Sequence, residues 1–218
     1  MTSGDRKICF IGIVERGFTM IEVLVSLFVF AVGMLSMAAL QVTSVRANFD
    51  AVQRSAATML AYDIIERMRA NSSQLIEYAG DDTTPAAALG GATQGGTTTP
   101  PNPNCATASC TAYELSQYDR WDWENALDGA SEKSGAGAGA TDVGGLVQPT
   151  ACITTTVPAG LSDRSGEYWV AIAWRGKTEI DTSTSDSNCG AGISKYDGDS
   201  GADTYRRVIV VKTYISAK

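Results

Sequence analysis

Histidine is absent from this sequence of 218 residues. Because histidine is the commonest general base and the commonest metal ligand in proteins, its absence removes the usual centre of acid–base catalysis and of zinc binding. Basic residues are also scarce, since 17 Lys and Arg stand against 24 Asp and Glu and give a formal charge of −7. A nucleic-acid-binding protein usually needs a basic face, so we expect no nucleic-acid partner.

The usual signatures of catalysis and metal binding are missing as well. No nucleophile–base pair, phosphate-binding loop, carboxylate dyad or Cys-x-x-Cys motif stands out along the chain. A zinc site needs several Cys or His ligands at such spacings. We therefore expect no enzymatic activity, no cofactor and no metal site.

Charge is missing again between residues 23 and 45, where no Asp, Glu, Lys or Arg occurs. The densest part, residues 23–40, would form a helix of about 27 Å, close to the roughly 30 Å hydrocarbon core of a bilayer. A buried helix of a soluble protein would show a polar stripe, but the only polar residues here are Ser26 and Ser36. The run therefore predicts a membrane-spanning helix over residues 18–45.

The flanking charges predict its orientation. Arg6, Lys7 and Arg16 precede the apolar run, and the first basic residue after it is Arg46. Positive charge accumulates on the cytoplasmic side of spanning helices, so we expect a single-pass protein with a cytoplasmic N-terminus. The rest of the chain then lies on the opposite side.

Glu22 opens the apolar run and is the only acidic residue between Glu15 and Asp50. A charge at the centre of a spanning helix costs roughly 3 kcal/mol on insertion scales. Near the helix start a carboxylate can reach water and favours the positive end of the helix dipole. Two interpretations follow: Glu22 is tolerated at the interface, or it pairs with a positive group inside a helix bundle.

The segment Arg16–Glu22, RGFTMIE, resembles the processing motif of type IV prepilins and of the pseudopilins of type II secretion. The resemblance implies that residues 1–17 are a leader, which a prepilin peptidase removes between Gly17 and Phe18. The same enzyme would then N-methylate Phe18. Glu22 and Thr19 become assembly residues, with the Glu22 carboxylate pairing with the terminal amine of a neighbouring subunit.

A conventional secretory signal is the competing interpretation of this region. Ser36-Met37-Ala38 could serve as a small-x-small cleavage site before Ala39 and release a soluble binding module. The apolar stretch is longer than a normal signal core, and Glu22 interrupts its start. Both features favour the prepilin interpretation.

The helix is expected to continue as an amphipathic half within residues 46–79, and Asn71-Ser72-Ser73 are expected to end it after Ala70. Apolar residues recur there at three- and four-residue steps, which is typical of a helix with one packed face. The expected packed face is Val42, Val45, Phe49, Val52, Ala56, Met59, Leu60, Ile64 and Met68. The expected solvated face is Arg46, Asp50, Gln53, Arg54, Asp63, Glu66, Arg67 and Arg69.

Residues 80–218 are expected to form a globular head. Residues 80–104 hold four of the six prolines and predict an irregular exposed loop, and residues 131–145 are rich in Gly and Ala. Thr111 and Glu114 have the spacing of a capping box, which predicts a helix from there to about Gly129. Its aromatic residues are expected to anchor it on a small sheet.

Three β-branched and aromatic runs, residues 152–157, 168–174 and 207–215, predict an antiparallel sheet laid across the amphipathic half of the helix. The fold class is therefore α+β. With the resemblance, it is the type IV pilin fold, in which a long N-terminal helix, half transmembrane, packs on a small sheet.

Four cysteines remain once the leader and its Cys9 are removed. Cys105, Cys110, Cys152 and Cys189 lie on the non-cytoplasmic side, where an even number predicts two disulfides. Three pairings are possible, and sequence proximity favours Cys105–Cys110 with Cys152–Cys189. Residues 197–203, DGDSGAD, lack the spacing of an EF-hand loop, so we interpret them as a solvated acidic turn; a calcium loop, as in some pseudopilins, is the alternative.

These features together look most like a minor pilin of the PilV type, which would help to initiate or cap a type IV pilus. The implied partners are the prepilin peptidase/N-methyltransferase, other minor and major pilins, the bacterial inner membrane and the pilus assembly platform. The subunit would reside in the inner membrane first, and then in the periplasm and the cell-surface pilus. A type II secretion pseudopilin and a secreted binding module are the alternatives.

Overall fold

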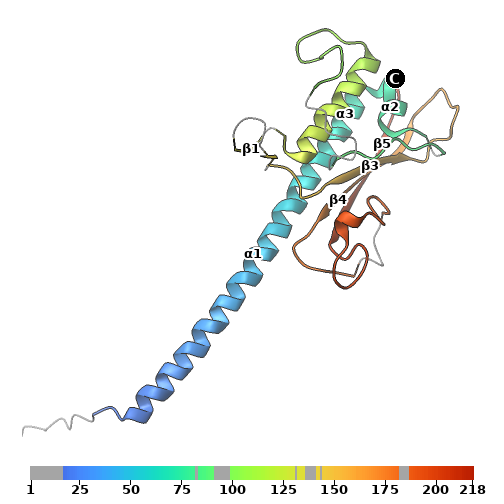
Figure 1. Cartoon of the computed structure of the whole chain (residues 1–218). Coiled ribbons are helices and arrows are strands. Elements are labelled where there is room, and N and C mark those ends of the chain that lie inside the picture. The colour runs from blue at the N-terminus through green and yellow to red at the C-terminus, as the bar shows by residue number, and fades with distance from the viewer. Residues whose placement is uncertain are drawn as a thin grey trace, which may run out of the picture. The chain divides into compact units, whose positions relative to one another are not determined.

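The computed structural model describes residues 17–81, 83–90, 99–130, 132–135, 141–142, 144–181 and 187–218 (Figure 1). The chain divides into two compact units, residues 1–45 and 46–218, which we describe separately. Apart from Gly17, the leader expected over residues 1–17 lies outside the described residues. The same holds for parts of the two expected loops, residues 82 and 91–98 of the first and residues 131, 136–140 and 143 of the second.

The long helix α1 runs from Met20 to Ala70 without a break. No proline lies within it, and its last turn carries Arg67 and Arg69, which interact favourably with the negative end of the helix dipole. It ends at Ala70, where the Asn71-Ser72-Ser73 segment was expected to end it, and residues 71–79 of the expected segment 46–79 do not continue it. They form a 3₁₀ turn, η1 (Ser72–Gln74), and a short helix, α2 (Leu75–Ala79).

The sheet of the second unit has three antiparallel strands in the order β3-β4-β5. The strands are β3 (Thr150–Thr155), β4 (Gly166–Arg175) and β5 (Arg206–Ile215). All three lie within two residues of the predicted runs, and Ile172 pairs with Ala151 on one side and Ile209 on the other. The prediction of an α+β fold with a small antiparallel sheet is confirmed.

One face of the sheet packs against the part of α1 that belongs to this unit. Tyr168, Val170 and Ile172 from β4 are fully buried in one core with α1 residues. The buried α1 residues are Gln53, Ala57, Ala61, Ile64, Ile65 and Met68. The small Ala57 and Ala61 side chains allow close approach of the helix to the sheet.

This packed face differs from the expected one. Val45, Val52 and Met59 are 69%, 58% and 71% exposed, although the sequence placed them in the core. Gln53, which was assigned to the solvated face, is buried, and its Oε1 accepts a hydrogen bond from the Val147 N–H at 2.9 Å. The error arose because apolar residues cover more than one face of α1, so periodicity alone could not select the face that meets the sheet.

Helix α3 (Ala112–Asp128) begins and ends as predicted. The Thr111 side chain accepts from the Glu114 amide, the Glu114 carboxylate accepts from the Thr111 N–H, and Gly129 ends the helix in a left-handed conformation. Figure 1 shows α3 beside the C-terminal part of α1. Hydrogen bonds join it to α1, and its buried Trp123 and Leu127 lie in one core with residues of both α1 and the sheet.

The loop segments contribute more to the fold than their composition suggested. Leu89 is 7% exposed, joins the core and forms a β-bridge with Ala151 at the outer edge of β3. A two-residue pair, β1 (Lys133–Ser134) with β2 (Thr141–Asp142), lies within the Gly- and Ala-rich segment. Residues 80–104 are therefore not entirely an exposed loop, because one leucine in them fills a gap beside β3.

Candidate functional site

The segment that precedes α1 is exposed and not helical. Gly17, Phe18 and Thr19 lie outside the helix, and the Phe18 side chain is 83% exposed. The Thr19 hydroxyl oxygen accepts a hydrogen bond from the Glu22 N–H at 3.3 Å. The Thr19 carbonyl oxygen accepts from the Glu22 and Val23 N–H groups, at 3.1 and 3.3 Å. Thr19 is therefore the N-cap of α1, and Glu22 occupies the third helical position.

Sequence reasoning assigned Thr19 to assembly but missed this cap. The signal was available, because Thr19 and Glu22 have the same Thr-x-x-Glu spacing as Thr111 and Glu114. At the start of α1 the Thr19 side chain makes its hydrogen bond of the capping box, from the Glu22 N–H, and the Glu22 carboxylate is exposed. The first turn of α1 thus holds an acidic group at a fixed place beside the chain segment that contains Gly17 and Phe18.

The first unit presents an almost continuous apolar surface. Among the described residues, α1 is the one helix that is long and apolar enough to cross a membrane, judged by length and composition alone. Residues 20–45 of it would measure about 39 Å, more than the roughly 30 Å hydrocarbon core. Around Glu22, a shallow groove is lined by Ile21, Val25, Ser26, Val29 and Phe30. The helix also runs unbroken through Ser36–Ala39, where the alternative signal cleavage site was considered.

The second unit holds the four cysteines in two disulfides. Cys105 is bonded to Cys110, five residues away, and this bond closes the loop before α3. Cys152 in β3 is bonded to Cys189, 37 residues away. This is the pairing that sequence proximity favours.

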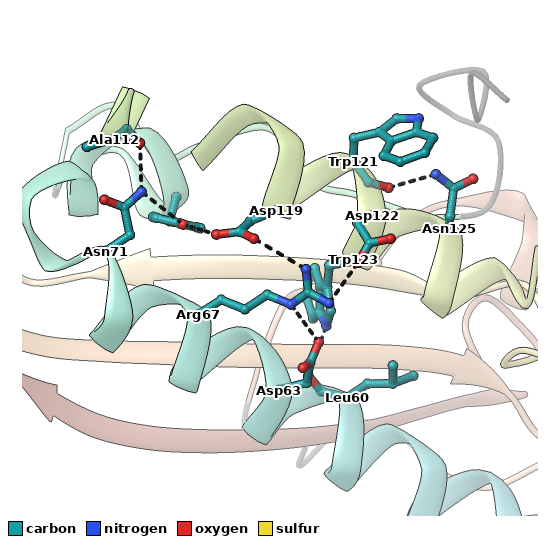
Figure 2. A network of polar contacts seen from close by, with 11 residues as sticks. Leu60, Asp63, Arg67, Asn71, Ala112, Asp119, Trp121, Asp122, Trp123 and Asn125 are labelled. Atoms are coloured by element: carbon teal, nitrogen blue, oxygen red, sulfur yellow. Dashed lines mark hydrogen bonds and ion pairs between the residues drawn. The ribbon is translucent and has the colours of Figure 1, made fainter. Parts of the chain in front are cut away.

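A polar network joins the end of α1 to α3, as Figure 2 shows. The Arg67 guanidinium donates to the Asp63 carboxylate at 2.9 Å, to Asp119 at 3.3 Å and to Asp122 at 2.8 Å. Asn71 donates from its side chain to the Ala112 carbonyl oxygen at 2.7 Å. One cation thus satisfies carboxylates from both helices, and the amide of Asn71 fixes the chain where α1 ends.

Tyr78 extends this network into the core. Its hydroxyl donates to the Asp119 carboxylate and accepts from the Asn71 amide. Burial and the hydrogen bond to Asp119 raise the pKa of Tyr78 well above its ordinary value. Burial lowers the pKa of Arg67, but the Asp122, Asp63 and Asp119 carboxylates more than offset this, so its pKa is raised overall. The network therefore holds a neutral phenol and a charged guanidinium and serves structural cohesion.

The aromatic residues of α3 divide between core and surface. Trp123 is fully buried, and its indole N–H donates to the Leu60 carbonyl oxygen of α1 at 2.9 Å. Tyr118 and Trp121 are half-buried, with ring centroids 5.4 Å apart. Trp123 is thus an anchor between helices, in keeping with the interpretation of these aromatics as packing residues.

Several arginine guanidinium groups of this unit donate hydrogen bonds to backbone carbonyl oxygens in loops. Arg164 donates to the Gly80 carbonyl oxygen at 2.6 Å, and Arg206 donates to those of Ser187 and Cys189. The same kind of bond runs from Arg120 to Glu77 and Ala87, from Arg175 to Lys195 and Asp197, and from Arg207 to Thr178. We call these five residues the arginine clamps.

The acidic turn at residues 197–203 uses its carboxylates within the protein. Asp197 accepts from the Asp203 N–H at 3.2 Å, and Asp203 accepts from the Gly192 N–H at 2.8 Å. Glu179 accepts from the Asp199 N–H at 2.6 Å. No group of three or more His, Cys, Asp or Glu side chains in the described part of the chain is arranged to hold a metal ion.

Comparison with protein families gives two adjoining matches. Residues 14–38 match the model of the prokaryotic N-terminal methylation motif. Residues 39–121 match a model named Tt1218-like and described as type IV pilin Tt1218. Over residues 14–121 the chain therefore resembles a type IV pilin domain that follows a prepilin methylation motif. Its long helix and three-stranded sheet are those of the type IV pilin fold.

The same comparisons found no matching curated protein and no matching solved structure. The methylation-motif match includes Gly17, Phe18, Thr19 and Glu22, and the pilin match includes the buried part of α1 and the first ten residues of α3. The matched region therefore ends before the sheet.

Proposed function

We propose that this chain is a non-enzymatic minor pilin of the PilV type, a subunit that helps to initiate a type IV pilus or forms part of its tip complex. One observation carries the proposal: a match to the methylation motif is followed directly by a match to a type IV pilin model. The motif spans the start of an exposed apolar helix, where Thr19 caps the first turn and Glu22 lies in it. The motif supports processing, the helix supports membrane storage, and the disulfide-bonded head supplies the specific surface.

Leader removal is the first step of the proposed mechanism. A prepilin peptidase cuts between Gly17 and Phe18 and methylates the new Phe18 amine. Both residues are exposed and lie before the helix, so their backbone can enter a peptidase cleft. Gly17 supports the cut because it has no side chain to clash there.

Membrane storage is the second step. The chain resides in the bacterial inner membrane with a cytoplasmic N-terminus, and the head lies in the periplasm, where two disulfides are stable. The charge asymmetry of Arg6, Lys7 and Arg16 supports this orientation.

Assembly is the third step, and it depends on Glu22. The Phe18 amine stays positive after methylation, and the Glu22 carboxylate of one subunit pairs with the amine of a neighbouring pilin at the assembly platform. An unpaired charge among packed apolar helices costs several kcal/mol, so only the docked register satisfies both groups. The Thr19 cap supports this step because it fixes the first turn, and with it the place of Glu22.

The minor role is proposed from size and composition. From Phe18 to Lys218 the mature chain has 201 residues, and the chain contains 22 glycines, many in two long segments. Such segments suit a specialised head better than a densely packed shaft. The subunit is then present in few copies.

Mass spectrometry of sheared surface fibres tests the proposal. We expect peptides that begin with N-methylated Phe18, in low abundance relative to the major subunit. The matched control is Gly17→Val, which we expect to leave an uncleaved chain in the inner membrane. A soluble periplasmic form that begins at Ala39 would contradict the proposal.

Crosslinking separates the pilus from a type II secretion pseudopilus, which shares the N-terminal chemistry. Crosslinks from the processed chain to pilus subunits support the proposal. Crosslinks to secretion-system components in place of pilus subunits would replace it with the pseudopilin role.

A further inference from the structure

The three-stranded sheet has two edges, and the structure treats them differently. At the β3 edge, Ala151 and Leu89 exchange two backbone hydrogen bonds of 2.8 Å. The β5 edge is longer, with all ten residues of β5 paired to β4 on the inner side. Among the residues that the structure describes, no strand or β-bridge partner lies on the outer side of β5, although the N–H of its first residue, Arg206, donates to the Asp203 carbonyl oxygen.

Two hydrogen bonds identify which backbone groups of β5 point outward. In an antiparallel ladder, the N–H and C=O of successive residues point to opposite neighbours. Gly176 donates to the Tyr205 carbonyl oxygen, and Arg175 donates toward the β3 side, to Val147. The backbone N–H and C=O groups of the odd-numbered residues of β5 therefore point to β4, and those of the even-numbered residues point outward. The outward N–H of Arg206 already donates to the Asp203 carbonyl oxygen at 2.9 Å, so the open outward set, which we call the β5 edge, is Val208, Val210, Lys212 and Tyr214.

The β5 edge has the composition of a pairing strand. It contains no proline, glycine or acidic residue, and Tyr214 is 64% exposed. An uncovered strand of this length is a template for pairing with another chain. The side chains of its outward residues share the sheet face opposite to the α1 core, so α1 does not cover them.

The charge of β5 indicates what can pair with it. β5 carries Arg206, Arg207 and Lys212 and no carboxylate, within a chain of net charge −7. Arg207 has an ion pair with Asp50, at 3.5 Å, but in the described part of the chain none is found for Arg206 or Lys212. The Lys212 ammonium lies 4.5 Å from the centre of the Trp169 ring.

A second copy of β5 is a poor partner for this edge. Arg206 and Arg207 use their guanidinium groups inside the head, so a second copy would bring its exposed Lys212 and no carboxylate to the seam, and like charges opposite each other on neighbouring strands are destabilising. A carboxylate opposite Lys212 would instead complete an opposite-charge pair. The preferred occupant is therefore a strand from a different polypeptide.

We propose that the β5 edge is a docking surface for an extended strand of a different polypeptide, with apolar residues opposite Val208 and Val210 and a carboxylate opposite Lys212. The strand adds to the sheet by backbone hydrogen bonds, and the carboxylate fixes its register. The inference rests on the sheet alone and stands apart from leader processing and fibre assembly.

Amide hydrogen exchange, measured by NMR on the full chain in detergent micelles, tests the proposal. The probe is the capped peptide Thr-Thr-Glu-Thr-Val-Thr-Val, which as an antiparallel strand sets Glu opposite Lys212 and Val opposite Val210 and Val208. We expect it to slow exchange at the amides of the β5 edge by about tenfold at ten times its dissociation constant. The amides of Ile209 and Val211, which already face β4, should not change.

Two variants and a second peptide complete the experiment. Val210→Pro removes an outward N–H, and an edge strand tolerates proline there, so we expect binding to be lost with the fold intact. Lys212→Glu should reverse the preference between the probe and its counterpart with Lys in place of Glu. The proposal is overturned if the edge amides are already protected without peptide, if the probe slows none of them, or if both peptides act equally on the unaltered chain.

Discussion

The indole N–H of Trp123 in α3 donates to the backbone carbonyl oxygen of Leu60 in α1 at 2.9 Å. This bond and the burial of the whole ring attach α3 to the long helix at the core of the head. We expect Trp123→Phe to lower the free energy of unfolding by about 1–3 kcal/mol, from the lost bond and the smaller ring. Urea unfolding followed by circular dichroism measures it, with the exposed Tyr113→Phe as a control that should change little.

Arg67 is the cation that three carboxylates share. Removing it leaves Asp119, whose side chain is only 11% exposed, without its ion pair. We expect Arg67→Met to cost about 2–3 kcal/mol of unfolding free energy, because a partly buried charge loses its partner. Arg54→Met, at an exposed site on the same helix, should cost less than about 0.5 kcal/mol. Equal losses in the two variants would contradict a structural role for the network.

Tyr196 makes the stability of the head sensitive to alkaline pH. Its hydroxyl donates to the Gln148 carbonyl oxygen at 2.8 Å, and burial raises its pKa from 10.0 to about 12. Because the folded pKa lies above the unfolded one, the contribution of the neutral phenol is complete below pH 10 and is lost between pH 10 and 12.

We therefore expect the unfolding free energy to fall above pH 10, with a contribution from Tyr196 of up to about 1.4 kcal/mol per pH unit. Tyr196→Phe should be less stable at pH 8, by about 1 kcal/mol, and should decline less steeply above pH 10. Denaturant titrations at a series of pH values measure both effects. A decline of unchanged slope in the variant would exclude Tyr196 as a source.

The two disulfides should contribute unequally to stability. Cys152–Cys189 closes a loop of 37 residues and Cys105–Cys110 one of five, so chain entropy predicts losses of about 4 and about 2 kcal/mol when each pair is replaced by Ala. Thermal unfolding of the two double variants checks this order. A larger loss for the Cys105–Cys110 pair would contradict it.

Glu22→Ala should separate processing from assembly. We expect normal leader removal and membrane insertion, but at least about tenfold fewer copies in fibres, because the neighbouring amine loses its carboxylate. Thr19→Val, which removes the capping hydroxyl and keeps the shape, should give a smaller defect, and Thr19→Ser should restore it. Ser26→Ala is the matched control, since that hydroxyl bonds only within its own helix. Normal incorporation of Glu22→Ala, counted by mass spectrometry, would contradict the amine–carboxylate account.

Local signals in the sequence predicted local structure well. The Thr111–Glu114 spacing and Gly129 gave both ends of α3, and three β-branched runs gave the strands of the sheet. These features depend on neighbouring residues, which is why a single sequence contains them. The uncharged run before Arg46 likewise predicted the exposed apolar part of α1.

Long-range contacts were harder to predict. The core face of α1 was misassigned because Val52 and Met59 are as apolar as Ile64, and only the sheet decides which of them it meets. Gln53 is buried because Val147, 94 residues away, supplies its partner. The bridge from Leu89 to Ala151 and the Arg67 network were not predicted for the same reason, because each joins residues far apart in the chain.

The arginine clamps have a consequence for how the head can diversify. They donate to carbonyl oxygens, which every amino acid supplies, and apart from the bond of Arg207 to the Thr178 hydroxyl they hold a loop without contacting its side-chain polar groups. The exposed Ala87, whose carbonyl oxygen Arg120 holds, could change identity in related chains while the loop keeps its path. Gly80 could not, because a Cβ there would lie 2.1 Å from the Thr84 carbonyl oxygen. The conformation of these loops therefore depends little on their exposed side chains, which can vary to suit different binding partners of the head.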